Sequence, residues 1–212
     1  MRALTLPTAA ALTLGAFATW PSHAAVLLSE NFDELTPQLG ATAVGALHTI
    51  DGTNVDIVGG ALFGSLCAPP ESGNCVDMDG TGGNPVGVLQ SNSSITLNPG
   101  TTYLLSFDLI GSQRGPTDSV TVTFGPYDKT FVLASNDNSS GIVSNAMITV
   151  TAPTSSFLTF QSNDPPGSVE GELLDDVLIT SQSTAVPEPA SRSLLAGALL
   201  GLGLIRRRRN RM

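Results

Sequence analysis

Apolar and polar residues alternate along the middle of the chain, and this period of two limits the fold more than any other feature. Every second residue is apolar from Tyr103 to Leu109 and again from Val120 to Phe124. Successive side chains point to opposite faces of a β-strand, whereas one face of a helix recurs every three to four residues. No amphipathic helix of three turns is evident. The pattern therefore predicts strands with one buried and one outward face.

Further segments of this kind recur between turn signals. Asn98-Pro99-Gly100 and Asp164-Pro165-Pro166-Gly167 combine Pro, which fixes φ, with Gly or Asn, which tolerate positive φ. About ten short strands at this spacing predict an all-β fold, an antiparallel β-sandwich in a single domain. The other expected strands are 26–32, 55–58, 61–66, 86–90, 94–97, 130–134, 146–151, 156–161 and 173–181.

Residues 1–24 have the pattern of a secretory signal peptide. Arg2 gives a basic start, residues 3–17 are almost wholly apolar, and a small-x-small site follows at Ser22-His23-Ala24. A permanent anchor is the alternative, but the apolar run is shorter than the roughly 20 residues that span a bilayer. The mature chain is therefore expected to begin at Ala25, outside the cytoplasm.

The C-terminal segment 186–212 combines three features in order. Val186-Pro187-Glu188-Pro189 comes first, residues 193–205 are rich in Leu, Gly and Ala, and arginines cluster at the end. Clustered positive charge resists translocation, so this end should stay in the cytoplasm. The apolar run is short for a membrane helix, which suits a transient anchor. The expected membrane stop consists of Arg206, Arg207, Arg208, Arg209 and Arg211.

Together these features resemble the PEP-CTERM sorting signal, with Pro187, Glu188 and Pro189 as the sorting motif. The resemblance implies export by the Sec machinery, transient retention in the inner membrane and recognition by an exosortase. Release to the cell surface or extracellular matrix would follow. The chain then divides into a signal peptide (1–24), an ectodomain (25–185) and a sorting signal (186–212).

The ectodomain is strongly acidic. The 18 acidic residues less Glu188 leave 17, and the nine basic residues less the seven in the terminal segments leave Arg114 and Lys129, a net charge of 2 − 17 = −15. Such a surface repels phosphate backbones, which excludes nucleic acid as a partner. It attracts divalent cations and polymers that they bridge. Alternatively, the acidic charge of the ectodomain serves only to keep the protein soluble.

Cys67 and Cys75 are both in the ectodomain and are expected to form a disulfide, because exported proteins enter an oxidising compartment. Zinc is the alternative. Two thiolates and His48, the single imidazole of the ectodomain, are too few for a typical four-ligand zinc site.

Short motifs in the ectodomain resemble known β-domains. Residues 75–83 and 99–115 resemble a β-rich ectodomain that recurs among PEP-CTERM proteins, and 173–179 is similar to the last strand of jelly-roll carbohydrate-binding modules. The likeness implies a jelly-roll-like sandwich, in which the first and last strands often pair. It implies little about activity.

Carboxylates near both ends of the ectodomain are candidate calcium ligands. Asp175 shares its strand parity with Val177 and Ile179, and Glu30 shares the parity of the apolar residues around it, so both should point inward. A calcium ion takes six to eight oxygens and would staple the ends of the domain together. Alternatively, the carboxylates accept backbone N–H groups at the rim. The candidate ligands are Glu30, Asp33, Asp175 and Asp176.

Two other polar segments, the Gly-rich stretch 77–84 and the loop that carries Arg114, are expected to have structural roles. Residues 77–84 place Asp77 and Asp79 before flexible glycines but do not match an EF-hand, so an ordinary Gly-rich loop is expected. Arg114 is expected to pair with a neighbouring carboxylate such as Asp118.

Catalysis finds little support. No serine lies in a G-x-S-x-G motif, and pairs of carboxylates arise by chance among 17 acids, the 18 of the chain less Glu188. Tyr127, in the turn after Gly125-Pro126, is the candidate platform for stacking on a sugar, with local packing as the alternative. The sequence thus predicts a non-enzymatic surface or matrix protein associated with exopolysaccharide. A calcium-dependent carbohydrate-binding module is the alternative, and a glycan-active enzyme is less favoured.

Overall fold

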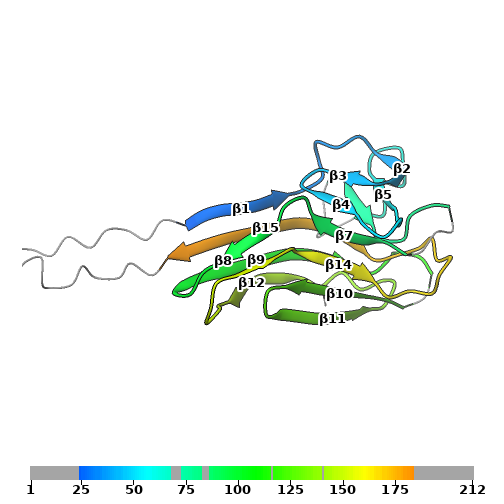
Figure 1. Cartoon of the computed structure of the whole chain (residues 1–212). Helices are drawn as coiled ribbons and strands as arrows, with labels where there is room; N and C mark the ends of the chain where they lie inside the picture. Colours follow the sequence, from blue (N-terminus) through cyan, green and yellow to red (C-terminus); the bar gives the residue numbers. More distant parts are fainter. Residues whose placement is uncertain (1–23, 68–72, 83–85, 116, 140, 184–212) are drawn as a thin grey trace, which may run out of the picture. The chain divides into compact units, whose positions relative to one another are not determined.

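Two antiparallel sheets form the body of the domain in the computed structural model, which describes residues 24–67, 73–82, 86–115, 117–139 and 141–183 (Figure 1). These residues belong to one compact unit that spans 22–184. The strand pairings among them are all antiparallel. The predicted all-β, sandwich-like class is therefore confirmed.

The strands divide between the sheets as follows. The larger sheet has the order β12 (Val143–Ile148), β9 (Thr101–Ile110), β15 (Leu173–Ser183), β6 (Cys75–Asp77), β5 (Val55–Val58) and β2 (Gln38–Ala41), with β1 (Ala24–Glu30) also paired to β15. The smaller sheet has the order β11 (Tyr127–Leu133), β10 (Asp118–Phe124), β14 (Thr159–Ser162), β7 (Val88–Ser91), β4 (Leu47–Thr49) and β3 (Ala43–Val44). A separate pair consists of β8 (Ile95–Leu97) and β13 (Thr154–Ser156).

The last strand, β15, holds the larger sheet together. One of its edges pairs with β9 from end to end, apart from one irregularity. The other edge pairs with β6 at Leu173 and Leu174 and with β1 over 177–182. Consequently β1 and β6 follow one another along the same edge of β15, and Figure 1 shows β1 running beside β15. The first and last strands are paired, as the jelly-roll resemblance led us to expect.

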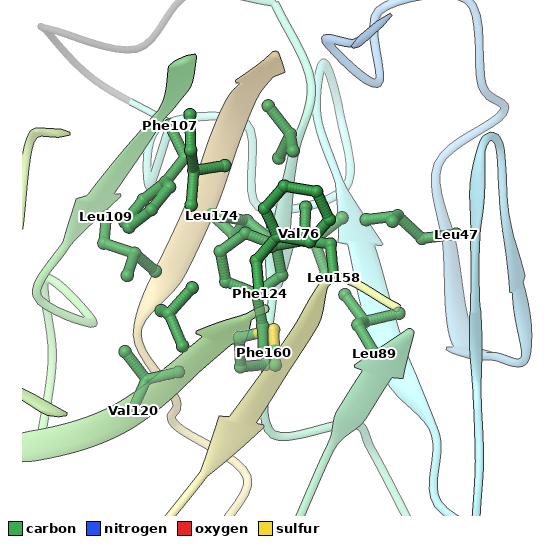
Figure 2. Packing of buried hydrophobic residues seen from close by; sticks show 14 of the residues in the cluster. Leu47, Val76, Leu89, Phe107, Leu109, Val120, Phe124, Leu158, Phe160 and Leu174 are labelled. Carbon is green, nitrogen blue, oxygen red and sulfur yellow. The ribbon is translucent and has the colours of Figure 1, made fainter. Parts of the chain in front are cut away.

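Alternating burial along the strands builds the core between the sheets. Residues of β9 and β10 alternate between buried and half-buried, which confirms the predicted period of two. The fully buried ring of Phe107 in β9 meets Phe160 of β14 edge-on, with centroids 5.2 Å apart, and Phe131 of β11 at 5.7 Å. Because β9 lies in one sheet and β11 and β14 lie in the other, these contacts join the two layers. Figure 2 shows Phe107 and Phe160 among the aliphatic side chains of this core.

Some expected strands differ from those observed. The predicted strand 61–66 is wrong, because this segment consists of turns. Phe63 has φ of +55°, and a Cβ on Gly64 would lie 2.4 Å from the backbone of Gly60, so the chain folds back on itself there. The predicted strand 156–161 is split between β13 and β14. The short strands β2, β3, β4 and β6 were not predicted.

The predicted terminal segments lie almost entirely outside the described residues. Ala24, at the predicted cleavage site, is the first residue of β1, and the rest of the signal peptide (1–24) is not described. The sorting signal (186–212), with its short membrane helix, also falls outside. Within the described ranges, no helix is long and apolar enough to cross a membrane.

The predicted disulfide is confirmed. Cys67 and Cys75 are both buried, and their sulfurs are bonded across a Cα–Cα distance of 5.7 Å. Cys75 begins β6, whereas Cys67 follows the turns after β5. The bond therefore ties an irregular segment to the larger sheet.

Replacing Phe107 with Ala should lower the free energy of unfolding by about 3–5 kcal/mol, because it removes a ring that both layers contact. Guanidinium denaturation measures the change. Val132→Ala is a suitable control, since the Val132 side chain on β11 is 65% exposed and its loss should matter little. A loss below about 1 kcal/mol for Phe107→Ala would contradict the proposed joining of the layers.

Removing the disulfide with a Cys67→Ala, Cys75→Ala double variant should lower stability by about 2–3 kcal/mol, since the closed loop is short. Thermal unfolding with and without reductant checks this. Reductant should destabilise the wild-type protein and leave the variant unchanged. If reductant destabilised both proteins equally, its effect would not come from breaking the Cys67–Cys75 bond, and the prediction would be wrong.

Candidate functional site

An acidic pocket of about 720 Å³ lies where β1, β9, β12 and β15 meet. Four carboxylates line it: Glu30, Glu34, Asp108 and Asp176. We call the cavity together with these carboxylates the acidic pocket. Serine and asparagine side chains complete the polar part of the wall, and no basic residue lines it. Burial, and then the charge of Asp176, raise the pKa of Asp108. The pocket suits a cation or a hydroxyl-rich ligand better than an anion.

The structure brings together only two of the four predicted calcium ligands. Glu30 and Asp176 line the acidic pocket, whereas Asp33 and Asp175 do not. Both oxygens of Glu30 accept backbone hydrogen bonds, from Phe32 N at 2.9 Å and Ala46 N at 2.7 Å. These bonds correspond to the alternative interpretation, in which the carboxylates hold backbone N–H groups at the rim.

Asp33 and Asp175 also accept backbone N–H groups. Asp33 is exposed, and its Oδ1 accepts a hydrogen bond from Asn74 N at 3.0 Å. Asp175 is buried, and its Oδ1 accepts one from Asp176 N at 2.7 Å. The predicted inward orientation of Asp175 is confirmed by its burial, and its neighbour Asp176 is exposed. Asp176 has φ of +50°, and the pairing of β15 with β9 shifts register after Asp175. The strand therefore has a β-bulge at this position.

The remaining predicted residues lie apart from the pocket. Tyr127 is half-buried and packs against the core, and burial raises the pKa of its hydroxyl. His48 Nδ1 lies 3.0 Å from Asn92 Oδ1. Arg114 does pair with a carboxylate, but the partner is Asp77, so the expected pairing with Asp118 is wrong.

A second group of carboxylates, which was not predicted from the sequence, lies around the start of β15. We call it the acid cluster: Asp79, Asp118, Asp164 and Glu172. Asp79 follows β6 and Glu172 precedes β15 in the larger sheet, whereas Asp118 begins β10 and Asp164 follows β14 in the smaller one. The acid cluster therefore spans both layers of the sandwich.

Two members of the acid cluster are buried without hydrogen-bond partners. The side chains of Asp79 and Glu172 are 0% exposed, and neither oxygen of either carboxylate meets a donor with hydrogen-bond geometry. Asp164 is partly satisfied, because its Oδ1 accepts a bond from Ser119 N at 3.2 Å. Neighbouring Asp77 has a full set of partners: Asp79 N, Gly171 N and the Arg114 guanidinium.

The pKa values of Asp77, Asp164 and Glu172 are raised, chiefly by burial. Desolvation raises the pKa of Asp77 to about 8 even though Arg114 opposes it. Desolvation, with the charges of Asp79 and Asp118, raises the pKa of Asp164 to about 7. Glu172 has a pKa well above its usual range, through burial and then the charges of Asp79, Asp164 and Asp118. The acid cluster can therefore hold either protons or a cation.

One of these residues carried a signal in the sequence. Asp118 has the same strand parity as Val120, Val122 and Phe124, and the structure buries all four. The Gly-rich-loop interpretation of residues 77–84 missed Asp79, whose carboxylate turns into the protein. No group of three or more His, Cys, Asp or Glu side chains in the described residues is already arranged as a metal site.

Without divalent cations, the free energy of unfolding should fall as pH rises from about 5 to 8. The pKa of Asp77 is raised to about 8 and that of Asp164 to about 7 in the folded protein, so folding takes up protons between the unfolded values near 4 and these values. The contribution of these groups to stability is complete below pH 4 and is lost as pH rises through the folded pKa values. Urea denaturation in chelator measures this. A flat or rising profile would contradict it, and Glu172→Gln should reduce the slope.

Comparison of the chain with protein-family models and with curated protein sequences found no match. Within the described part of the chain, the acidic pocket and the acid cluster are groups of side chains suited to binding a ligand or an ion.

Proposed function

We propose that this chain is an exported cell-surface or extracellular-matrix protein that carries a PEP-CTERM sorting signal. Its ectodomain would be a jelly-roll-like, non-enzymatic component associated with exopolysaccharide. The observation that carries the proposal is the order of features in 186–212: Pro187-Glu188-Pro189, a short apolar segment and an arginine tail. A signal peptide at 1–24 supplies the matching route of export.

The pairing of the first and last strands supports this arrangement. Ala25 of β1 lies opposite Ser181 of β15, so the ectodomain begins and ends at the same end of the sheet. The polypeptide continues from that end toward the sorting signal. Because both ends of the domain lie at the same end of the sheet, a single C-terminal tail can anchor the domain without distorting its strands. The pairing also supports a jelly-roll-like topology over other sandwiches.

The chemistry of the described side chains favours a binding or structural role. Both oxygens of Glu30 hold backbone N–H groups, which makes this carboxylate part of the scaffold. The disulfide and the acidic surface suit a protein that has to persist outside the cell. Divalent cations would bridge such a surface to acidic polymers.

A calcium-dependent carbohydrate-binding module is the second candidate, and the acidic pocket favours it. Asp108 and Asp176 lie close enough in the pocket for one charge to raise the pKa of the other, and several hydroxyl side chains surround them. Carboxylates and hydroxyls can bind sugar hydroxyls directly or through calcium. Tyr127 would contribute as a platform only if its half-buried ring were reachable by a ligand.

Mass spectrometry of the protein from the cells that make it tests the sorting proposal. The recovered protein should begin at Ala25 and lack Arg206–Arg211. A Glu188→Ala variant should keep the arginine tail and stay with the membrane fraction, because the sorting motif is lost while the membrane stop remains. A Glu170→Ala variant, altered in the ectodomain, should be processed normally. Recovery of the full chain, Arg211 included, free in the growth medium would contradict the proposal.

Retention on immobilised polysaccharides separates the two candidate functions. A carbohydrate-binding module should be retained by one polysaccharide class, with retention reduced at least about tenfold by Asp176→Asn if one pocket contact carries the recognition. Tyr127→Ala tests the platform in the same assay. A matrix protein held by general charge should lose retention with salt and respond little to either variant. Turnover of a glycan by the purified protein would instead establish the less favoured enzyme.

A further inference from the structure

We propose that the acid cluster binds one calcium ion, which joins the two sheets at the end of the sandwich where β15 begins. Asp79 and Glu172 would approach the ion from the larger sheet, and Asp118 and Asp164 from the smaller one. This site differs from the acidic pocket and from the ligands predicted by sequence. It also stands independently of the sorting signal.

Unpartnered buried carboxylates are the first observation behind the proposal. Asp79 and Glu172 are each 0% exposed and make no hydrogen bond through either carboxylate oxygen. An ionised carboxylate in such a place costs several kcal/mol unless it is paired.

Two other buried carboxylates in the domain have hydrogen-bond or ion-pair partners for both of their oxygens. Asp56, which is 3% exposed, accepts hydrogen bonds from Gly40 N, Thr81 N and Thr81 Oγ1 at 2.7, 2.9 and 2.5 Å. Asp77 accepts two backbone N–H groups and pairs with Arg114. The domain therefore supplies donors where a carboxylate is held by protein alone, and it supplies none to Asp79 and Glu172.

The ectodomain has no spare basic side chain to neutralise the acid cluster. Its only bases between 25 and 185 are Arg114 and Lys129. Arg114 is paired with Asp77, and the Lys129 ammonium lies 4.3 Å from the ring centroid of Phe131 on β11. The compensating charge must come from protons or from a cation in the surroundings.

The local backbone brings the attachment points of the carboxylates together within each sheet. Gly171 N donates to Asp77, Met78 N donates to Glu172 O, and a Cβ on Gly171 would lie 2.5 Å from Asp79 N. Across the sandwich, Ser119 N donates to Asp164 beside the start of β10. The strands thus fix the four attachment points, while the carboxylates themselves repel one another. Because no ready metal arrangement exists among the described residues, the ion would have to draw the side chains inward by rotation about their χ angles.

Calcium fits this donor set better than other common ions. All four side chains offer oxygen alone, whereas zinc favours nitrogen and sulfur. Magnesium keeps several waters and takes few carboxylates, whereas calcium accepts six to eight oxygens, including bidentate carboxylates and backbone carbonyls. Four carboxylates with nearby backbone carbonyls match the calcium pattern.

Calorimetry and thermal unfolding of the exported protein, as recovered from the cells and stripped of metal with chelator, test the proposal. Calcium chloride should bind at one equivalent per chain and raise the melting temperature by about 5–10 °C at a hundredfold excess over Kd. Magnesium chloride at the same concentration should have a much smaller effect. Sodium chloride at matched ionic strength controls for screening of the acidic surface.

Glu172→Gln and Asp79→Asn keep the size of the side chain and remove one buried charge each. In chelator, either variant should melt at or above the wild-type temperature, so a lost calcium response is not a folding failure. Neither variant should bind calcium in calorimetry or gain more than about a quarter of the wild-type shift. Asp128→Asn, which removes an exposed carboxylate on β11, should respond as the wild type does.

Three results would overturn the proposal. The first is an unchanged wild-type melting temperature with no heat of calcium binding. The second is a calcium response that survives in Glu172→Gln but disappears in Asp176→Asn, which would place the ion in the acidic pocket. The third is an equal shift with magnesium, which would show that the site does not select for calcium.

Discussion

The strand β15 is the constraint on which the rest of the domain depends. It pairs with β9 along one edge and with β6 and β1 along the other. Its register therefore fixes the positions of three other strands at once. Glu172 stands just before its first residue, and Asp176 turns outward at its bulge. A shift of one residue would reverse the faces of Asp175 and Val177, expose the core and scatter both groups of carboxylates.

Charge is the second constraint, and it works differently at the two sites. The acidic pocket is reached by solvent and includes exposed carboxylates such as Glu34, so water and salt screen their repulsion. The acid cluster lies in the protein, where screening is weak and burial raises pKa values. Buried carboxylates of the cluster such as Glu172 therefore need a proton or a cation to offset their charge.

Sequence reasoning recovered the strands wherever one face was buried and the other was not. β10 alternates along its whole length and β9 from Thr102 to Leu109, so parity alone placed them and the orientation of Asp175 on β15. β6 was missed because its three residues are all buried and show no alternation. The predicted strand 61–66 failed because apolar composition there accompanies turns and the disulfide rather than a ladder.

The acid cluster escaped prediction for a related reason. Parity assigns a direction only within a recognised strand, and both Asp79 and Glu172 lie just beyond strand ends. Their proximity follows from the pairing of β6 with β15, a contact between segments far apart in the chain. Asp118 did have an inward parity, but a single inward carboxylate does not reveal its partners. Local patterns therefore indicate which carboxylates are buried, and only the sheet topology shows which of them meet.

The two sites also bear on how calcium dependence of any glycan binding should be interpreted. An ion in the acid cluster would act at the start of β15, and the same strand carries Asp176 into the acidic pocket. Chelation could then weaken a ligand at the pocket by loosening the strand, without any ion in contact with the ligand. Calcium-dependent retention alone therefore does not place the ion. Comparing Glu172→Gln with wild type in chelator separates the two cases, because that variant relieves the buried charge and leaves every pocket side chain in place.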